Sequence, residues 1–333
     1  MRVMFAGSPA IAVPSLEALS REDGIELVGV LTSPDNPRGR SGRSQPSETG
    51  DAAAAILKEY EMKGRPSFPI LKPLKLDSAI REQAGSLKPD LLVSFAYGRF
   101  FGPKFMALFP LGGINIHPSL LPKYRGPAPI QAAILNRDDV TGISIQKLSQ
   151  EMDGGDILVS EQLQLTGEET AGSLSEIMAE KAARMLPDVL KKIVGGTACG
   201  TAQDAGKVSY CSLISIDDAI IDWKMSAAEI EARVRAFDPW PLCRTVHNGR
   251  DLLILKASVY KGKNDGALKE LRLEKLRLEN PGLVLGIDKQ DGILVQTGEG
   301  ILALTKLQYQ AKKALFWRDF LNGARDFLGS VLG

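Results

Sequence analysis

Residues 113–126 read GINIHPSLLPKYRG, and the first five of them follow the pattern of a buried strand that ends in a loop. Two isoleucines alternate with Asn115 and His117, so an extended chain places both polar side chains on one face. The proline that follows His117 biases it towards an extended conformation and ends the strand there. Ligands bind at such strand ends in open α/β sheets, so the sequence predicts a site at this point.

The side chains at this strand end suit acyl transfer. An imidazole donates or accepts a proton near pH 7, an amide offers both a donor and an acceptor, and together they stabilise an oxyanion. A carboxylate that orients the histidine would complete the set, and Asp153 follows the next predicted strand, within EMDGGD at 151–156. From the residues alone a structural role stays open, because polar residues at strand ends and Asp-Gly turns are common.

Strands and helices alternate on both sides of this segment. Short apolar runs predict strands at 3–6, 25–32, 89–96, 142–148 and 156–165. Helical patterns predict helices at 51–61, 77–84, 129–135 and 170–193. This alternation predicts an α/β fold with an N-terminal, Rossmann-like, mainly parallel sheet that has helices on both faces.

The chain changes character after the last of these helices. Residues 195–206 are small, polar and rich in glycine, so we interpret them as a linker between a domain at 1–194 and a second at 207–333. Short strands separated by glycine turns are predicted at 252–259, 282–287, 292–296 and 300–307. They favour a smaller C-terminal β-barrel, similar to the oligonucleotide-binding type.

Composition limits the classes of function. The chain has 333 residues, 44% of them hydrophobic and 24% charged, with a net charge of +1, so an electrostatic grip on nucleic acid over the whole surface is not indicated. No segment has the length of a membrane span or the pattern of a signal peptide, so we expect a cytoplasmic protein that contacts no membrane. Three cysteines and two histidines match no zinc spacing, and we expect no metal site.

The segment NIHPSLLPKYRG at 115–126 resembles the signature of the 10-formyltetrahydrofolate-dependent formyltransferases. In that family an Asn, a His and the Asp of a downstream Asp-x-Gly segment form the catalytic set. The resemblance therefore implies catalytic roles for Asn115, His117 and Asp153, and their spacing agrees with that of the family. It also implies 10-formyltetrahydrofolate as the formyl donor.

A folate-binding set follows from the same resemblance. In the family, the Ser-Leu-Leu-Pro loop lies against the folate, and the segment after the central strand lines the same pocket. The matching residues in this sequence are Ser119, Leu120, Leu121, Pro122, Tyr97 and Gly98. The structural interpretation of the loop, a rigid turn bounded by prolines, is compatible with folate binding.

The second half resembles the members of the family that act on tRNA. The matching segments are IDW at 221–223, RAFDPWP at 235–241 and GEGIL at 298–302. This similarity implies that the second domain binds tRNA. Those members also carry a basic loop after the second strand, which implies tRNA contacts from Arg38, Arg40 and Arg43. From charge alone, a solvated surface loop stays open for these arginines.

The resemblance implies transfer of a formyl group to the α-amino group of methionine on initiator methionyl-tRNA, for translation initiation. We expect the protein to be a monomer. The amine would attack the formyl carbon, while Asn115 and protonated His117 stabilise the oxyanion and Asp153 orients the imidazole. Three alternatives stay open. They are a formyltransferase that acts on glycinamide ribonucleotide or a nucleotide sugar, a formyltetrahydrofolate hydrolase, and a non-catalytic RNA-binding protein.

Overall fold

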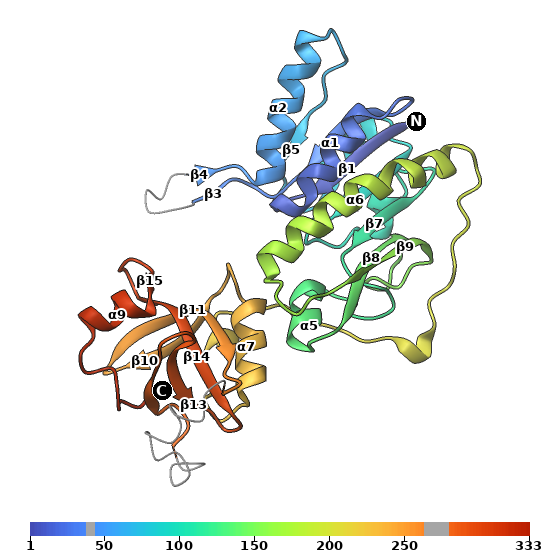
Figure 1. The fold of residues 1–333 in the computed structure, drawn as a ribbon. Coiled ribbons are helices and arrows are strands. Elements are labelled where there is room, and N and C mark those ends of the chain that lie inside the picture. The colour runs from blue at the N-terminus through green and yellow to red at the C-terminus, as the bar shows by residue number, and fades with distance from the viewer. Residues whose placement is uncertain (38–43, 263–279) are drawn as a thin grey trace. The chain divides into compact units, whose positions relative to one another are not determined.

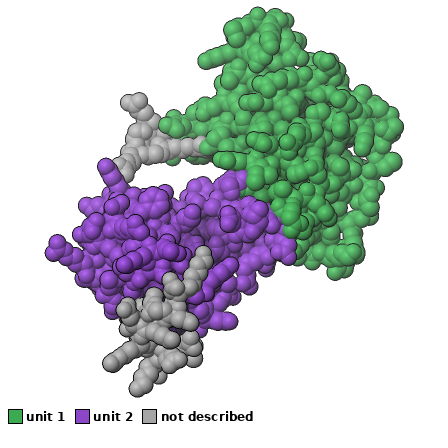
Figure 2. Space-filling model, viewed as in Figure 1, with its two compact units in different colours: residues 1–129, 140–164, 174–213 green, residues 130–139, 165–173, 214–333 purple. Residues whose placement is uncertain are grey.

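The computed structural model describes residues 1–37, 44–262 and 280–333, and the chain forms two compact units (Figure 1, Figure 2). The first consists of Met1–Pro129, Val140–Gln164 and Leu174–Leu213, and the second of Ile130–Asp139, Leu165–Ser173 and Ile214–Gly333. The predicted tRNA contacts Arg38, Arg40 and Arg43 lie outside the described residues. Within the described ranges, no helix combines the length and apolar character that a membrane crossing requires.

A seven-stranded sheet organises the first unit, in the order β5-β2-β1-β6-β7-β8-β9. Its strands are β1 (Arg2–Gly7), β2 (Glu26–Leu31), β5 (Ile70–Leu71), β6 (Leu91–Phe95), β7 (Gly113–His117), β8 (Val140–Lys147) and β9 (Ile157–Gln164). Pairing is parallel from β5 through β7, and antiparallel where β8 joins β7 and where β9 joins β8. The predicted mainly parallel sheet is confirmed, and its antiparallel edge lies next to the strand that carries Asn115.

Helices cover both faces of this sheet, as predicted. Met4 and Ala6 of β1 are fully buried in a cluster that includes Ala84 of α3 and Phe105 of α4. The intervening Phe5 points to the opposite face, because side chains alternate along a strand, and it is also fully buried. Figure 1 shows α1 and α6 lying across the sheet. The helices of this unit are α1 (Val13–Arg21), α2 (Glu48–Met62), α3 (Ser78–Ser86), α4 (Pro103–Met106) and most of α6 (Ala171–Val194). Except for its first residue, α5 (Pro129–Leu135) belongs to the second unit.

The second unit is built on an antiparallel sheet in the order β10-β11-β14-β13-β12, with β15 paired to β14. Its elements are α7 (Ala227–Ala236), β10 (Cys243–His247), β11 (Arg250–Val259), β12 (Val284–Asp288), β13 (Gly292–Gln296), β14 (Ile301–Tyr309), β15 (Leu315–Phe316) and α9 (Trp317–Gly323). The C-terminal backbone joins the two edge strands, because Ser330 accepts from Val284 of β12 at 2.9 Å and Gly333 donates to Val246 of β10 at 3.1 Å. The predicted second domain of short strands is therefore confirmed as an antiparallel sheet, and its likeness to a barrel of the oligonucleotide-binding type stays a prediction.

Some elements were not predicted from the sequence. The strand β10 was missed because its inward-facing residues Cys243, Thr245 and His247 are not strongly apolar, although all three are buried. The short helices α4 and α9 and the hairpin of β3 (Asn36–Pro37) with β4 (Ser44–Gln45) were missed as well. The segment interpreted as a linker is partly ordered against the first unit, since Thr201 and Ile157 exchange two backbone hydrogen bonds of 2.8 Å.

Candidate active site

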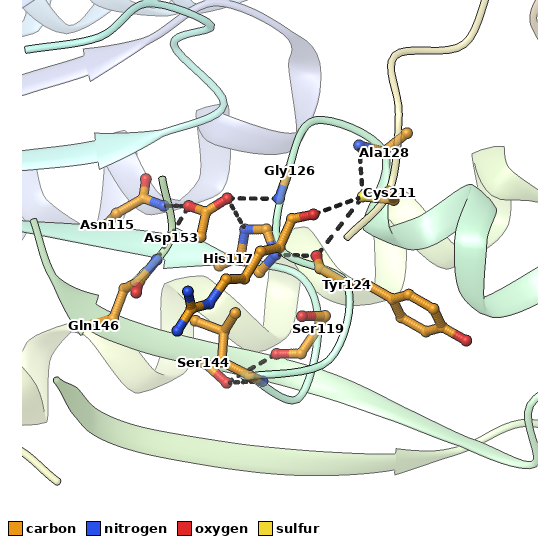
Figure 3. A network of polar contacts seen from close by, with 12 residues as sticks. Asn115, His117, Ser119, Tyr124, Gly126, Ala128, Ser144, Gln146, Asp153 and Cys211 are labelled. Carbon is orange, nitrogen blue, oxygen red and sulfur yellow. Dashed lines mark hydrogen bonds and ion pairs between the residues drawn. The ribbon is translucent and has the colours of Figure 1, made fainter. Parts of the chain in front are cut away.

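Asn115 and Asp153 meet at the end of β7. Asn115 lies opposite Gln146 in the antiparallel pairing of β7 with β8, and both amides point to the loop that follows β8. In that loop the Asp153 Oδ1 accepts hydrogen bonds from Asn115 Nδ2 at 3.2 Å and from Gln146 Nε2 at 3.1 Å (Figure 3). Its Oδ2 accepts from the backbone N–H of Gly126 at 2.8 Å. Three donors that face two oxygens are an arrangement suited to an ionised carboxylate.

The backbone at Asp153 is strained. Its φ is +50°, in the left-handed region, which costs a residue other than glycine about 1–2 kcal/mol. The turn is also tightly packed, because a Cβ added at Gly155 would lie 1.9 Å from the carbonyl oxygen of Lys147. Strain of this kind persists only where the surrounding contacts hold it, and it concentrates at functional sites.

His117 is buried, and both of its ring nitrogens face oxygen. Nδ1 lies 3.6 Å from Asp153 Oδ2, and Nε2 lies 2.8 Å from the carbonyl oxygen of Tyr124. Only the Nε2 contact is within hydrogen-bond distance, whereas the 3.6 Å contact of Nδ1 is longer than a hydrogen bond. The ring is thus fixed by the Tyr124 carbonyl and lies beside the Asp153 carboxylate.

This arrangement bears on the role predicted for His117. Neither ring nitrogen points freely into the site, so the ring cannot donate to a substrate oxygen unless it leaves the Tyr124 carbonyl. Asn115 is better placed as a donor in this conformation. Asp153 takes one N–H of its amide, which leaves the second N–H for a substrate oxygen.

The predicted loop Ser119–Leu120–Leu121–Pro122 is anchored to β8 by Ser144. The Ser144 Oγ donates to the carbonyl of Ser119 at 2.8 Å and accepts from the N–H of Leu121 at 3.1 Å. Ser119 is fully buried and its Oγ donates to the Lys123 carbonyl at 2.6 Å, whereas Leu120 and Pro122 are half-buried. The loop is thus a rigid structure beside His117, and its contact with folate stays a prediction.

Tyr97 and Gly98 follow β6, the strand next to β7. The Tyr97 ring is 5% exposed and stacks on Phe101 with 5.4 Å between ring centroids, and burial raises the pKa of its phenol. Its Oη and the Arg99 Nη1 are buried and have no hydrogen-bond partner among the described residues. Buried polar atoms of this kind require a partner, so they are available to a polar ligand. Gly98 is exposed, with a φ of +76°.

Several polar residues of the site were not predicted. Arg125 is only 4% exposed, and its guanidinium contacts Glu151 Oε1 at 2.5 Å and Gln203 Oε1 at 2.9 and 3.0 Å. Gln146 and Gln203 both reach the Asp153 turn. The register of β7 with β8 is the only signal that would have identified Gln146, and the sequence contains no signal for Gln203.

Cys211 closes the site on the side of the 124–128 loop. Its Sγ lies 3.4 Å from the Ala128 N–H and 3.4 Å from the Arg125 carbonyl. Burial, reinforced by the charge of Asp153, raises the pKa of this thiol, so it is protonated at neutral pH and is a poor nucleophile. Within the described part of the chain, no three His, Cys, Asp or Glu side chains are grouped so that they could hold a metal ion.

Comparison with known proteins agrees with this geometry. The family described as "Formyl transferase" matches residues 1–190, and "Formyl transferase, C-terminal domain" matches residues 213–325. The chain is 47% identical over 328 residues to a protein of Treponema denticola named methionyl-tRNA formyltransferase, covering 98% of each chain. It is 36% identical to a protein of the same name from Borrelia duttonii, covering 99% of each.

A solved structure shares the fold. The N-formyltransferase of Helicobacter canadensis, determined with folinic acid and dTDP-3-aminofucose, superposes with a TM-score of 0.60 at 20% identity. The match covers 91% of this chain and 98% of the other. On the two family matches and the full-length relatives, this chain belongs to the formyl transferase family.

Proposed function

We propose that this enzyme transfers the formyl group of 10-formyltetrahydrofolate to the α-amino group of methionine on initiator methionyl-tRNA. The observation that carries the chemistry is the meeting of Asn115, His117 and Asp153 at one strand end. The choice of acceptor is supported by the full-length relatives named methionyl-tRNA formyltransferase. In the proposed division of labour, residues 1–194 perform the transfer and residues 207–333 bind the tRNA.

The reaction needs a stabilised oxyanion and a route for one proton. The amine attacks the formyl carbon to form a new C–N bond, and the bond from that carbon to N10 of the folate then breaks. The proton lost by the amine ends on N10, so the step is balanced without a further reactant. Asn115 donates its second N–H to the oxyanion, which is the type of interaction that preorganised sites use most effectively.

His117 and Asp153 contribute to the reaction through their charges. The imidazolium of His117 places a positive charge beside the developing oxyanion, and it donates directly once the ring leaves the Tyr124 carbonyl. Asp153 orients the ring, receives the amine proton through water and gives it up again, so that the proton ends on N10 when the bond from the carbon to N10 breaks. The donors that surround its carboxylate keep the acid oriented through both steps.

A folate-derived donor fits what the residues offer. The unpartnered Tyr97 Oη and Arg99 Nη1 can bond the polar edge or the carboxylates of such a ligand. The related N-formyltransferase of Helicobacter canadensis was determined with folinic acid. Ser119, Leu120, Leu121 and Pro122 remain the proposed contacts of the folate, and Arg38, Arg40 and Arg43 those of the tRNA. A monomeric state and a cytoplasmic location also remain predictions.

An acceptor assay tests the proposal. The purified protein is incubated with 10-formyltetrahydrofolate and either charged or uncharged initiator tRNA, and N-formylmethionine is measured after release from the tRNA. We expect formylation of the charged tRNA alone. Parallel reactions offer glycinamide ribonucleotide or an amino-sugar nucleotide, and one contains no acceptor. Faster transfer to a small acceptor, or formate release without any acceptor, would refute the proposed substrate.

A further inference from the structure

Gln203 brings the segment interpreted as a linker into the active site. The segment is seated on the first unit by the backbone pairing of Thr201 with Ile157, the first residue of β9. A second attachment follows further along, where the backbone of Arg125 donates to Ser209 and accepts from Cys211, both at 2.8 Å. Between these two attachments, the side chain of Gln203 reaches the Asp153 turn.

The amide of Gln203 is held from both ends. Its Oε1 accepts from Arg125 Nε at 3.0 Å and from Arg125 Nη2 at 2.9 Å. Its Nε2 donates to the carbonyls of Asp153 and Gly155, each at 2.8 Å, and lies 3.2 Å from Gln146 Oε1. Every neighbour of the oxygen is a donor and every neighbour of the nitrogen is an acceptor. The orientation of the amide is therefore set by its chemistry.

These bonds stabilise the strained part of the site. Asp153 has a φ of +50°, and Gln203 binds the carbonyls on both sides of this turn, at Asp153 and Gly155. Gln203 also touches Gln146, which in turn donates to the Asp153 carboxylate. The amide of Gln203 thus contacts both the backbone of Asp153 and one of the side chains that orient its acid.

The far end of this network is held by Arg125. The Arg125 guanidinium is buried, and it binds Glu151 Oε1 at 2.5 Å in addition to Gln203. Tyr210 adds a contact of 3.3 Å from its Oη to the same carboxylate oxygen. A planar guanidinium with several bonds holds its partner in a defined direction, so Arg125 aims the Gln203 amide at the turn.

We propose that Gln203 is a positioning residue for Asp153, so that formyl transfer depends on the seating of residues 201–211 against the first unit. The proposal rests on the proposed function for its kinetic test. Residues that orient an acid without touching the substrate lower turnover when they are removed, because small displacements of a catalytic group are costly. Substrate affinity changes much less.

The substitution Gln203→Glu isolates the end of the side chain that faces Asp153. The carboxylate keeps the size of the amide and its bonds to Arg125, but it cannot donate to the carbonyls of Asp153 and Gly155. We expect kcat to fall by about 10- to 100-fold with KM for both substrates nearly unchanged. The melting temperature should fall as well, because the carbonyls of Asp153 and Gly155 lose their donor. The matched control is Gln162→Glu, the same change at an exposed position of β9, which should keep wild-type kcat.

A second comparison separates positioning from a general structural role. If Gln203 acts through Asp153, then Gln203→Glu should add little to the loss caused by Asp153→Asn in the double variant. An unchanged kcat in Gln203→Glu would overturn the proposal. So would an equal loss of kcat in the wild-type and Asp153→Asn backgrounds.

A spectroscopic measurement keeps the test independent of the substrate. The chain has only two histidines, so selective ¹⁵N labelling of histidine yields imidazole signals from His117 and His247 alone. We expect Gln203→Glu to shift the His117 signals and Gln162→Glu to leave them in place. Absence of formyl transfer by the wild type would reject the proposed function, whereas unshifted His117 signals would reject the role of Gln203.

Discussion

The Asp153 carboxylate lies 3.6 Å from Nδ1 of His117, and it also accepts from Asn115. The opposite nitrogen of the same ring faces the Tyr124 carbonyl at 2.8 Å. The acid and the backbone oxygen thus enclose the ring between two acceptors. In the proposed mechanism the ring acts as an imidazolium, which has an N–H on each of the two nitrogens that face these oxygens.

Asn115→Ala should lower kcat by about 100-fold or more, because it removes a preorganised donor to the oxyanion. The melting temperature should change little, since Asn115 is only half-buried and Asp153 keeps the donors at Gln146 and Gly126. Steady-state kinetics measures the fall in kcat, and thermal unfolding measures the change in melting temperature. Turnover close to that of the wild type would contradict a role for this amide in the reaction.

His117→Ala should reduce kcat at least as strongly and should also destabilise the fold. The substitution leaves the buried Tyr124 carbonyl without its ring partner, which costs about 1–3 kcal/mol. Chemical denaturation gives the loss of stability, and kcat measured well below the unfolding transition gives the catalytic effect. Full activity in a folded His117→Ala protein would exclude the proposed mechanism.

Asp153→Asn should lower kcat by about 100-fold without a large change in packing. The amide NH₂ would meet donors from Asn115, Gln146 or Gly126 in either orientation, and the negative charge beside His117 is lost. Asp156→Asn is the matched control in the same loop. Its carboxylate forms a solvent-exposed ion pair with Lys147, of the kind that contributes at most about 1 kcal/mol. Equal losses in the two variants would show that the effect is not specific to Asp153.

Gly155→Ala should distort the turn that presents Asp153. A methyl group at this position would lie 1.9 Å from the Lys147 carbonyl oxygen, so the backbone must move. We expect a loss of about 1–3 kcal/mol of stability together with reduced kcat. Gly102→Ala is the control, because an added Cβ there meets no heavy atom within 4 Å among the described residues. A Gly155→Ala protein with normal kcat would show that the turn tolerates displacement.

The three cysteines should react with a thiol reagent in a defined order. Cys199 is exposed, whereas burial raises the pKa of Cys211 and raises that of Cys243 to about 12. The thiolate is the reactive form, so a raised pKa lowers the reactive fraction at pH 8 and shifts reaction to higher pH. Titration of native protein with a chromogenic disulfide should show fast reaction at Cys199 only. All three should react in denaturant, and fast native labelling of Cys243 would contradict its burial.

Hydrophobic periodicity and one long sequence motif were enough to predict much of the fold and of the candidate site. The apolar runs predicted the strands of the parallel sheet, because a strand buried on both faces must be apolar throughout. The alternation at 113–117 placed Asn115 and His117 on one face. The resemblance pointed to Asp153, and the structure brings these three side chains together. Their catalytic roles remain a proposal.

Other features could not be predicted, because they arise from contacts between distant segments. The small, polar composition of residues 195–206 predicts a linker, yet backbone pairing seats part of this segment on the first unit. Nothing local distinguishes Gln203 from any solvated glutamine. Its neighbours come from the 125, 146 and 153 regions, which only the folded chain assembles.

The sequence by itself determined the class of fold, the family and the side chains able to do the chemistry, because these depend on periodicity and on a contiguous motif. The tertiary structure alone decided the direction and the contacts of those side chains. It placed His117 between two acceptors, strained the backbone at Asp153, and positioned Arg125 and Gln203 to hold it. These features depend on contacts between segments that are distant in the sequence. Strand register and loop packing set those contacts, so no local sequence pattern encodes them.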